Sequence, residues 1–193
     1  MIVVFGGSFN PPTIAHYEIA MHILKQNFCK KFYFLPVGDA YPKRGLITAK
    51  HRVAMLELLC EKLPQASVSL IEIQSEKVLT TYETLSQLQK KYPEEEIAFI
   101  VGADNLKDLP NWFQYEQLMK TFKLIVFKRD DIEVNQLISN QFPSFKDRFI
   151  VLDAFHQRDI SSTMYRENPN RTDLVLESVD DYIKRHQLYG RGE

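Results

Sequence analysis

Glycine, hydroxyl and histidine side chains follow a short apolar run at the start of the chain. Gly6, Gly7 and Ser8 come soon after this run, and Thr13 and His16 stand at the expected start of a helix. Glycines let a ligand approach the backbone, and a helix start offers N–H groups and a partial positive charge to an anion. This spacing could bind phosphate, with Thr13 and His16 facing one ligand. An ordinary strand–turn–helix connection with a surface histidine is the alternative that these residues leave open.

A second polar group lies in residues 159–166. Ser161, Ser162 or Thr163 would cap the start of a short helix, and Arg166 follows about one turn later. Hydroxyls, N–H groups and an arginine together suit the oxygens of a triphosphate. The simpler alternative is that the hydroxyls only cap the helix.

Two further stretches carry single polar groups that could reach a ligand. Lys43 lies in a turn-rich stretch after an apolar segment, and Gly102 and Asp104 follow another apolar segment. Lys43 could bind phosphate, and the Asp104 carboxylate could accept hydrogen bonds from ribose hydroxyls. A solvated lysine and a helix N-cap are the alternatives. Trp112, the only tryptophan in the sequence, could face a ligand or pack in a core.

The elements that must position these residues alternate along the whole chain. Apolar runs predict strands at 1–4, 31–36, 68–73, 97–101, 124–127 and 149–152. Helical spacing predicts helices at 14–28, 49–62, 80–91, 115–119, 131–139 and 174–188. The alternation predicts an α/β fold with a Rossmann-like, doubly wound, mostly parallel sheet flanked by helices. Ligands bind beyond the carboxyl ends of such strands, so the loops after the first, second and fourth strands should form the site.

Composition and charge narrow the function classes. A chain of 193 residues, 45% of them hydrophobic, can bury one core, so residues 1–193 are predicted to form a single domain. The formal net charge of −1 gives no electrostatic footprint for nucleic acid or a membrane surface. No apolar run approaches the ~18–20 residues that span a bilayer, and the N-terminus is a strand candidate rather than a signal peptide. Cys29 and Cys60 form neither a metal motif nor a disulfide framework, so a cytoplasmic location is expected.

The N-terminal motif resembles that of a known family. The run GGSFNPPTIAH resembles the signature G-(S/T)-F-(D/N)-P-x-(H/T)-x-G-H of the nucleotidyltransferases related to class I aminoacyl-tRNA synthetases. Within them, the GGSFNPP form is similar to bacterial nicotinate mononucleotide adenylyltransferases. Thr13 departs from the first histidine of those enzymes, which weakens the substrate assignment but not the chemistry. Ala15 departs from their glycine, and its methyl group is expected to tighten or shift the ATP site.

Later motifs extend this resemblance over essentially the whole chain. Residues 160–163 with Arg166 look like the ISSTxIR signature, and the spacing from Gly102 to Trp112 is similar to the family's dinucleotide motif. Residues 80–85 resemble (S)YTxDTL, with threonine and glutamate at two positions. A proline and a lysine in the loop after the second strand and an arginine in the next helix also match, and Arg52 is expected to support that loop rather than to touch substrate.

The resemblance implies an enzyme that transfers AMP from ATP to nicotinate mononucleotide, forming deamido-NAD and pyrophosphate. The nucleotide phosphate would attack the α-phosphorus directly, so positioning and charge neutralisation would supply the catalysis. Mg²⁺ is expected to bridge the polyphosphate through substrate oxygens and water, without a dedicated protein site. The implied catalytic residues are His16, Thr13, Lys43 and Arg166. The implied ATP-binding residues are Gly6, Gly7, Ser8, Phe9, Gly102, Asp104, Ile160, Ser161, Ser162 and Thr163. The implied residues for the pyridine mononucleotide are Thr81, Tyr82, Trp112 and Phe113.

Two other functions stay open at the level of sequence. A pantetheine-phosphate adenylyltransferase is favoured by Thr13 and disfavoured by the Trp112 motif and the longer chain. A non-catalytic nucleotide-binding regulator of the same fold is allowed by the departures at Thr13 and Ala15. The sequence also leaves open a homo-oligomer and the choice between the acid and amide mononucleotides.

Overall fold

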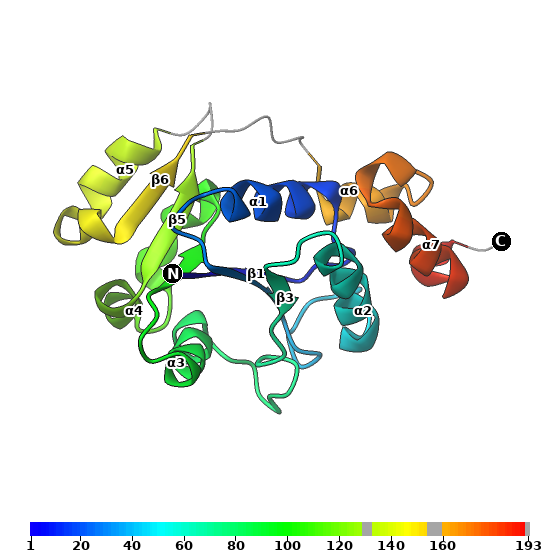
Figure 1. Ribbon diagram of the computed structural model, residues 1–193, viewed down its shortest axis with the longest axis horizontal. Coiled ribbons are helices and arrows are strands. Elements are labelled where there is room, and N and C mark those ends of the chain that lie inside the picture. Colours follow the sequence, from blue (N-terminus) through cyan, green and yellow to red (C-terminus); the bar gives the residue numbers. More distant parts are fainter. Residues whose placement is uncertain (129–132, 154–159, 192–193) are drawn as a thin grey trace.

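The computed structural model describes residues 1–128, 133–153 and 160–191. Its centre is a six-stranded parallel sheet of order β3-β2-β1-β4-β5-β6 (Figure 1). The strands are β1 (Ile2–Gly7), β2 (Lys31–Pro36), β3 (Ala66–Val68), β4 (Ile97–Ile100), β5 (Lys123–Phe127) and β6 (Phe149–Leu152). The strand order reverses between β1 and β4, which confirms the predicted doubly wound fold. In such folds ligands bind beyond the carboxyl ends of the strands at the point of reversal.

Helices cover both faces of the sheet (Figure 1). They are α1 (Ile14–Leu24), α2 (Ala49–Cys60), α3 (Thr81–Lys91), α4 (Tyr115–Thr121), α5 (Val134–Gln141), α6 (Ser162–Glu167) and α7 (Glu177–Arg185). Short 3₁₀ turns are η1 (Ala103–Leu106), η2 (Leu109–Asn111), η3 (Pro143–Arg148), η4 (Thr172–Leu174) and η5 (Leu188–Gly190). Residues of α1, α2, α6 and α7 share one hydrophobic cluster, and residues of α3, α4 and α5 share a second.

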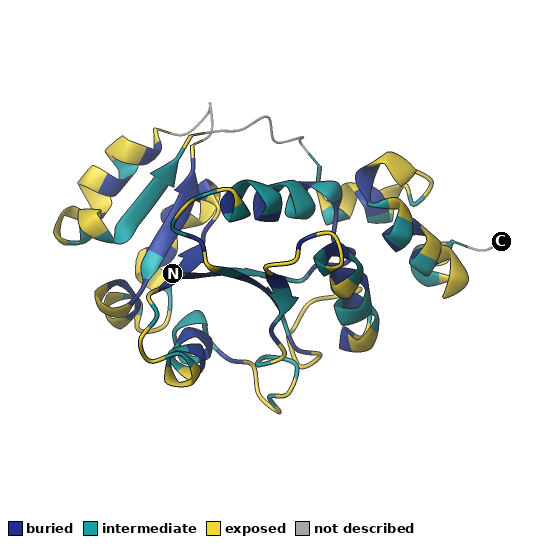
Figure 2. Cartoon of the chain, viewed as in Figure 1, coloured by how far each residue is buried: buried dark blue, intermediate teal, exposed yellow. Residues whose placement is uncertain are grey.

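Alternation along the strands explains the two clusters. Val3 of β1 belongs to the first cluster, whereas its neighbours Ile2 and Val4 belong to the second. Side chains of successive strand residues point to opposite faces, so a strand covered on both faces must be apolar at every position. Burial follows this pattern, with the central strands buried and the outer helix faces exposed (Figure 2).

The third strand is the clearest error in the predicted elements. The prediction placed it at 68–73, but β3 ends at Val68 and the chain then turns, with the Gln74 N–H donating to the Leu70 carbonyl. The register pairs Val68 with Phe34, so Leu70 would stand opposite Pro36, which has no N–H to donate. The sheet ladder therefore stops where the apolar pattern continues.

The first strand was predicted at 1–4, but β1 runs from Ile2 to Gly7, because Gly6 and Gly7 continue the parallel pairing with Leu35 and Pro36 of β2. The other differences are shifts of one residue at strand ends and shifts at helix ends. Helix α1 ends at Leu24 instead of residue 28, because the chain must turn back to begin β2 at Lys31. The last helix, α7, is shorter than the predicted 174–188, and a 3₁₀ turn flanks it on each side. The predicted helix 131–139 corresponds to α5, and its first two positions lie outside the described residues.

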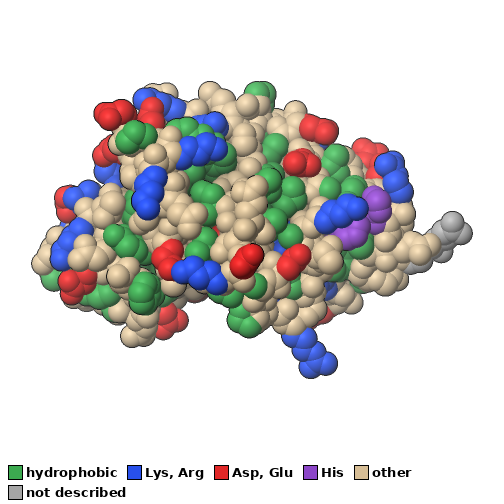
Figure 3. Space-filling view, turned by 90° about the horizontal axis from the view of Figure 1, so that it is seen from below, with side chains coloured by type: hydrophobic (Ala, Val, Ile, Leu, Met, Phe, Trp, Pro, Cys, Tyr) green, Lys and Arg blue, Asp and Glu red, His purple; other side chains and the backbone are tan. Residues whose placement is uncertain are grey.

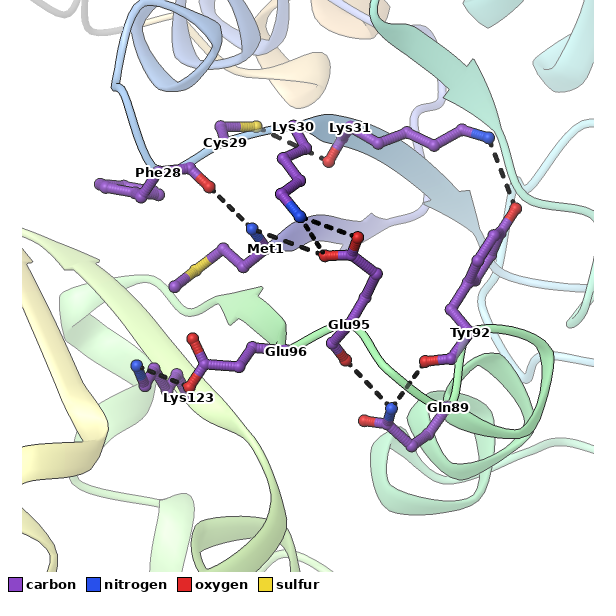
Figure 4. A network of polar contacts seen from close by, with 10 residues as sticks. All are labelled: Met1, Phe28, Cys29, Lys30, Lys31, Gln89, Tyr92, Glu95, Glu96 and Lys123. Carbon is purple, nitrogen blue, oxygen red and sulfur yellow. Dashed lines mark hydrogen bonds and ion pairs between the residues drawn. The ribbon is translucent and has the colours of Figure 1, made fainter.

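A polar network lies at the amino ends of the central strands (Figure 4). The N-terminal amino group donates to the Phe28 carbonyl at 2.8 Å and lies 4.0 Å from a carboxylate oxygen of Glu95. Lys30 pairs with the same carboxylate at 3.0 Å, and Lys123 pairs with Glu96 at 2.9 Å. These contacts hold together the amino ends of the strands, opposite the carboxyl ends where the site is predicted.

Acidic and basic side chains both occur on the surface of the protein. On the face seen in Figure 3, acidic and basic side chains lie interspersed among hydrophobic ones, in line with the formal net charge of −1. Within residues 1–128, 133–153 and 160–191, the helices are too short or too polar to cross a membrane.

Candidate active site

His16 lies in the first turn of α1, held by the residue that caps this helix. The Thr13 backbone N–H donates to Nδ1 of His16 at 2.9 Å, and the Thr13 hydroxyl lies 2.7 Å from the same nitrogen. The rings of Phe5 and Phe9 pack against the imidazole, with centroids 5.7 and 5.1 Å away. Burial lowers the pKa of His16 to about 4. The imidazole is therefore neutral at pH 7, and because Nδ1 accepts, its proton sits on Nε2.

Lys43 reaches the same loop from the segment after β2. Its Nζ donates to the Ser8 hydroxyl at 2.9 Å. Burial lowers the pKa of Lys43, and the positive charges of Arg166 and Arg52 lower it further. Lys43 is thus surrounded by like charge, an arrangement that an anion would relieve.

Arg52 supports this loop from inside the protein. The guanidinium is fully buried and donates to the carbonyls of Ile47 and Ser8 at 2.9 and 3.2 Å. It also pairs with Asp39 at 3.1 Å, and the same carboxylate oxygen accepts the Ala49 N–H. These contacts match the sequence prediction that Arg52 holds the loop in place.

The start of α6 is fastened to the loop after β1. The Ser161 hydroxyl caps the helix by accepting the Met164 N–H, and the Ser162 hydroxyl donates to the Pro11 carbonyl at 2.7 Å. Arg166 donates to the Asn10 carbonyl at 2.7 Å and to the Thr163 hydroxyl at 2.9 Å. Ile160 packs against the first hydrophobic cluster. Asp159, the first residue of the predicted motif, lies outside the described residues.

Asn10 has a structural role in the site that no residue pattern in the sequence indicated. Its side chain is 1% exposed. The amide nitrogen donates to the Gly45 carbonyl at 2.8 Å, and the amide oxygen accepts from the Tyr189 hydroxyl at 2.9 Å and the Ile47 N–H at 3.4 Å. With Arg166 on its carbonyl, Asn10 joins four segments that are far apart in sequence. Both polar atoms of the buried amide are hydrogen-bonded, as is usual for buried polar groups. The partners come from distant parts of the chain, so the sequence does not predict them.

Gly6 and Gly7, the last two residues of β1, also have a packing role. A Cβ on Gly6 would lie 2.8 Å from the ring of Phe99, and a Cβ on Gly7 would lie 3.2 Å from the ring of Phe9. Phe9 is buried and its backbone has a φ of 45°. The glycines therefore make room for aromatic rings in the crevice, in addition to any approach of a ligand.

Residues predicted to bind ATP and residues predicted to bind the pyridine mononucleotide both lie in the segment after β4. Gly102 and Asp104 are exposed at the start of η1, in the loop that directly follows the strand. Trp112 is half-buried and meets the ring of Phe99 edge-on, with centroids 6.4 Å apart. Phe113 is 58% exposed. Phe99 also lies against Gly6. One aromatic ring therefore connects the carboxyl end of β1 to the tryptophan.

The start of α3 is already capped by its own residues. Thr80 and Glu83 form a reciprocal capping box, in which the Thr80 hydroxyl accepts the Glu83 N–H and the Glu83 carboxylate accepts the Thr80 N–H. The first backbone hydrogen bond of the helix runs from the Thr84 N–H to the Thr80 carbonyl. The N–H groups of Thr81 and Tyr82 therefore have no acceptor within the helix. Hydrogen bonds from Thr80 and the nearby Lys77 lower the pKa of Glu83 to about 2. An ionised carboxylate therefore shares this helix end with the site predicted for the substrate.

Three consecutive residues connect the predicted phosphate ligands. Ser8 bonds Lys43, Phe9 packs on His16, and Asn10 accepts from Arg166. The structure thus brings the four predicted catalytic residues around one loop at the carboxyl end of β1. The loop gathers a neutral imidazole, which can donate a hydrogen bond, and two cations, which can bind an anion.

Comparisons with known proteins give this site a family. Residues 4–168 match the model of the cytidylyltransferase-like family. The chain is 34% identical to a probable nicotinate-nucleotide adenylyltransferase of Acholeplasma laidlawii over 98% of this chain and 97% of the relative. It is 32% identical to a protein of the same name from Carboxydothermus hydrogenoformans, over 97% of each chain.

Solved structures share the fold. The nicotinic acid mononucleotide adenylyltransferase of Plasmodium falciparum, solved in complex with NaAD, has a TM-score of 0.83 and 20% sequence identity. The match covers 99% of this chain and 98% of that one. With the sequence relatives, these findings mean that the chain belongs to the cytidylyltransferase-like family, among the nicotinate-nucleotide adenylyltransferases.

Proposed function

We propose that this protein transfers AMP from ATP to nicotinate mononucleotide, producing deamido-NAD and pyrophosphate. The observation that carries the proposal is the loop of Ser8, Phe9 and Asn10, whose three residues contact Lys43, His16 and Arg166 in turn. The names of the similar proteins supply the substrate class, and the loop supplies a physical means of binding a polyphosphate.

The reaction needs charge neutralisation rather than a protein nucleophile. A phosphate oxygen of the mononucleotide attacks the α-phosphorus of ATP, a new P–O bond forms, and the bond to pyrophosphate breaks. His16 donates through Nε2–H, because Thr13 holds its Nδ1 as an acceptor. Lys43 and Arg166 neutralise charge on the phosphate oxygens. Ser162 and Thr163 contribute hydroxyls, and Thr13 acts by orienting the imidazole.

Mg²⁺ fits this site as a companion of ATP. The side chains that face the loop are cations and neutral donors, which suit phosphate oxygens and repel a bare dication. The described residues contain no group of three or more histidine, cysteine or acidic side chains arranged to hold a metal. Mg²⁺ would therefore be held by polyphosphate oxygens and water, and it would add positive charge at the polyphosphate.

The pyridine mononucleotide is assigned to the region beyond β4. Trp112 provides a stacking surface beside Phe99, with the exposed Phe113 next to it. The N–H groups of Thr81 and Tyr82 are the proposed readers of the nicotinate carboxylate. Gly102 and Asp104, at the end of the strand beside β1, are proposed to meet the ribose of ATP.

Two broader features belong to the same proposal. Residues 1–193 act as one nucleotidyltransferase domain, which the single continuous sheet supports. A cytoplasmic location is supported by the free thiols of Cys29 and Cys60. Self-association is left to measurement of the molecular mass in solution.

An acceptor panel tests the proposed function. Pyrophosphate release is measured with ATP and Mg²⁺ plus nicotinate mononucleotide, its amide or phosphopantetheine, each as sole acceptor. We expect the highest kcat/KM with nicotinate mononucleotide. Turnover with phosphopantetheine alone would contradict the substrate, and binding of ATP without turnover of any acceptor would favour a regulator.

A further inference from the structure

The turn η5 near the C-terminus lies against the loop after β1. The Tyr189 hydroxyl donates to the Asn10 amide oxygen at 2.9 Å, although the two residues are 179 positions apart in the chain. The remaining groups of the Asn10 side chain and its carbonyl bond Gly45, Ile47 and Arg166. The tyrosine hydroxyl therefore completes the set of hydrogen bonds that fixes this loop.

The backbone of the turn has an unusual conformation. Gln187 and Tyr189 have φ angles of 51° and 57°, in the left-handed region that residues other than glycine rarely adopt. Such conformations persist only where surrounding contacts over-determine them, and they are frequent at functional sites. At Tyr189 these contacts are the hydroxyl bond to Asn10 and the packing of its ring.

Contacts on both sides hold the tyrosine ring in place. The ring meets the buried ring of Tyr165 edge-on, with centroids 5.9 Å apart. Just beyond the turn, Arg191 pairs with the buried carboxylate of Asp180, which also accepts from the Tyr165 hydroxyl at 3.4 Å. The phenol is thus presented to the loop from a rigid base.

The electrostatics keep the hydroxyl a donor. Burial raises the pKa of Tyr189 far above its usual value, while the nearby charges of Arg166 and Arg52 act in the opposite direction and are outweighed. Both arginines also contact the loop, Arg166 at the Asn10 carbonyl and Arg52 at the Ser8 carbonyl. Tyr189 therefore lies within the same set of groups that surrounds the phosphate loop.

We propose that Tyr189 is a positioning residue for adenylyl transfer, which holds Asn10 and thereby the loop that presents His16 and Arg166 to ATP. The inference rests on the proposed function. Tyr189 touches neither substrate, and it acts through the loop. Its loss should therefore change how ATP is held in the transition state rather than remove a reacting group.

Two phenylalanine variants test this proposal. Tyr189→Phe keeps the ring against Tyr165 and removes only the hydroxyl. Tyr182→Phe is the matched control, because it removes a hydroxyl from the neighbouring helix α7 that bonds Nδ1 of His51 at 3.0 Å, away from Asn10. Both proteins are studied well below their melting temperatures, by amide hydrogen exchange of residues 5–13 and by steady-state kinetics with ATP and nicotinate mononucleotide.

The expected result has two parts. In Tyr189→Phe, exchange in residues 5–13 accelerates and kcat/KM for ATP falls about tenfold, on the scale of one lost hydrogen bond, whereas KM for the mononucleotide changes little. Tyr182→Phe should match wild type in both measurements. Equal effects of the two variants, or normal ATP kinetics in Tyr189→Phe, would overturn the positioning role. If the wild type does not turn over, the proposed function fails, and the exchange comparison still decides whether Tyr189 holds the loop.

Discussion

At the scale of single residues, the tautomer of His16 defines its contribution. Thr13 occupies Nδ1, and burial among phenylalanine rings keeps the imidazole neutral. In the proposed mechanism, Nε2–H is then a directional donor for a phosphate oxygen. His16→Ala should lower kcat by about 10²–10³, the scale seen when one donor to developing charge is removed. Pyrophosphate release under saturating substrates measures this effect.

The matched control for that variant lies on the same helix. His22→Ala removes a histidine from the last turn of α1, at the opposite end from the phosphate loop. It should retain wild-type kcat. If His16→Ala also turned over normally, the imidazole would have no part in the reaction.

Arg166 contributes through the shape of its guanidinium as well as its charge. Its two terminal nitrogens donate to different acceptors, the Asn10 carbonyl and the Thr163 hydroxyl. A lysine keeps the charge but cannot span both acceptors. We therefore expect Arg166→Lys to raise KM for ATP about tenfold, measured with nicotinate mononucleotide held at saturation.

Arg171 provides the comparison for this substitution. It is exposed, and its guanidinium binds both oxygens of Asp173 at 2.7 Å in the turn after α6. Arg171→Lys should leave KM for ATP unchanged. An Arg166→Lys enzyme with wild-type ATP kinetics would contradict a role of the planar guanidinium in ATP binding.

At the scale of elements, the sequence predicted the bounds of a strand correctly where the apolar pattern and the neighbouring turn residues indicated the same ends. The bounds predicted for the second and sixth strands are those of β2 and β6, because both segments are short apolar runs of strand length. The third strand was misplaced because its end depends on Pro36 in the neighbouring strand, not on its own residues. Pairing partners of this kind cannot be read from a single segment.

The candidate site also contains residues that the sequence could indicate and contacts that it could not. His16, Lys43 and Arg166 could be named from the sequence, since residue types and loop position are local properties. The junction at Asn10 could not, because its side-chain partners Gly45, Ile47 and Tyr189 come from distant segments. Contacts that join distant segments are set by packing of the whole fold and leave no periodic signal.

The element after β4 supports a prediction about substrate stacking. Trp112→Ala should raise KM for nicotinate mononucleotide more than KM for ATP, because an indole ring can stack on the pyridine of only one substrate. Phe145→Ala is the control, since Phe145 packs on the same hydrophobic cluster from η3 and its loss creates a comparable defect. An unchanged mononucleotide KM in Trp112→Ala would refute the stacking role.

The start of α3 supports a prediction about acid and amide. N–H donors and the helix dipole favour the carboxylate, and the amide would place a donor against donors, so we expect a preference of about 10²-fold in kcat/KM for the acid. Glu83→Gln should increase this preference a further ~2–5-fold, because it removes a like charge while glutamine can keep the capping box. Rates with both mononucleotides measure each effect. Equal use of acid and amide by the wild type would refute the carboxylate-reading helix start.

At the scale of the whole molecule, His16 makes stability depend on pH. Its pKa is about 4 in the folded state against 6.5 for an unperturbed histidine, so the unfolded chain binds more protons between these values. The stabilisation is complete above pH 6.5 and is lost as pH falls towards 4. The loss amounts to about 3 kcal/mol at most, from about 1.4 kcal/mol for each pKa unit.

A difference measurement isolates this effect from other titrating groups. Urea unfolding of wild type and His16→Gln at pH 7.5 and pH 4 gives two free-energy differences. The advantage of wild type over the variant should shrink by about 3 kcal/mol at the lower pH. A difference that does not depend on pH would show that the imidazole is not held neutral.

The distant contacts of Asn10 also bear on when the protein becomes competent during its synthesis. The loop that holds Asn10 is translated first, but Arg166 and Tyr189 reach it from 156 and 179 positions later. At ~5–20 residues per second, a ribosome needs roughly ten to forty seconds to cover that interval. The nascent chain thus carries an unfinished ATP loop for most of its translation, and nucleotide binding matures only after the C-terminal turn has left the exit tunnel.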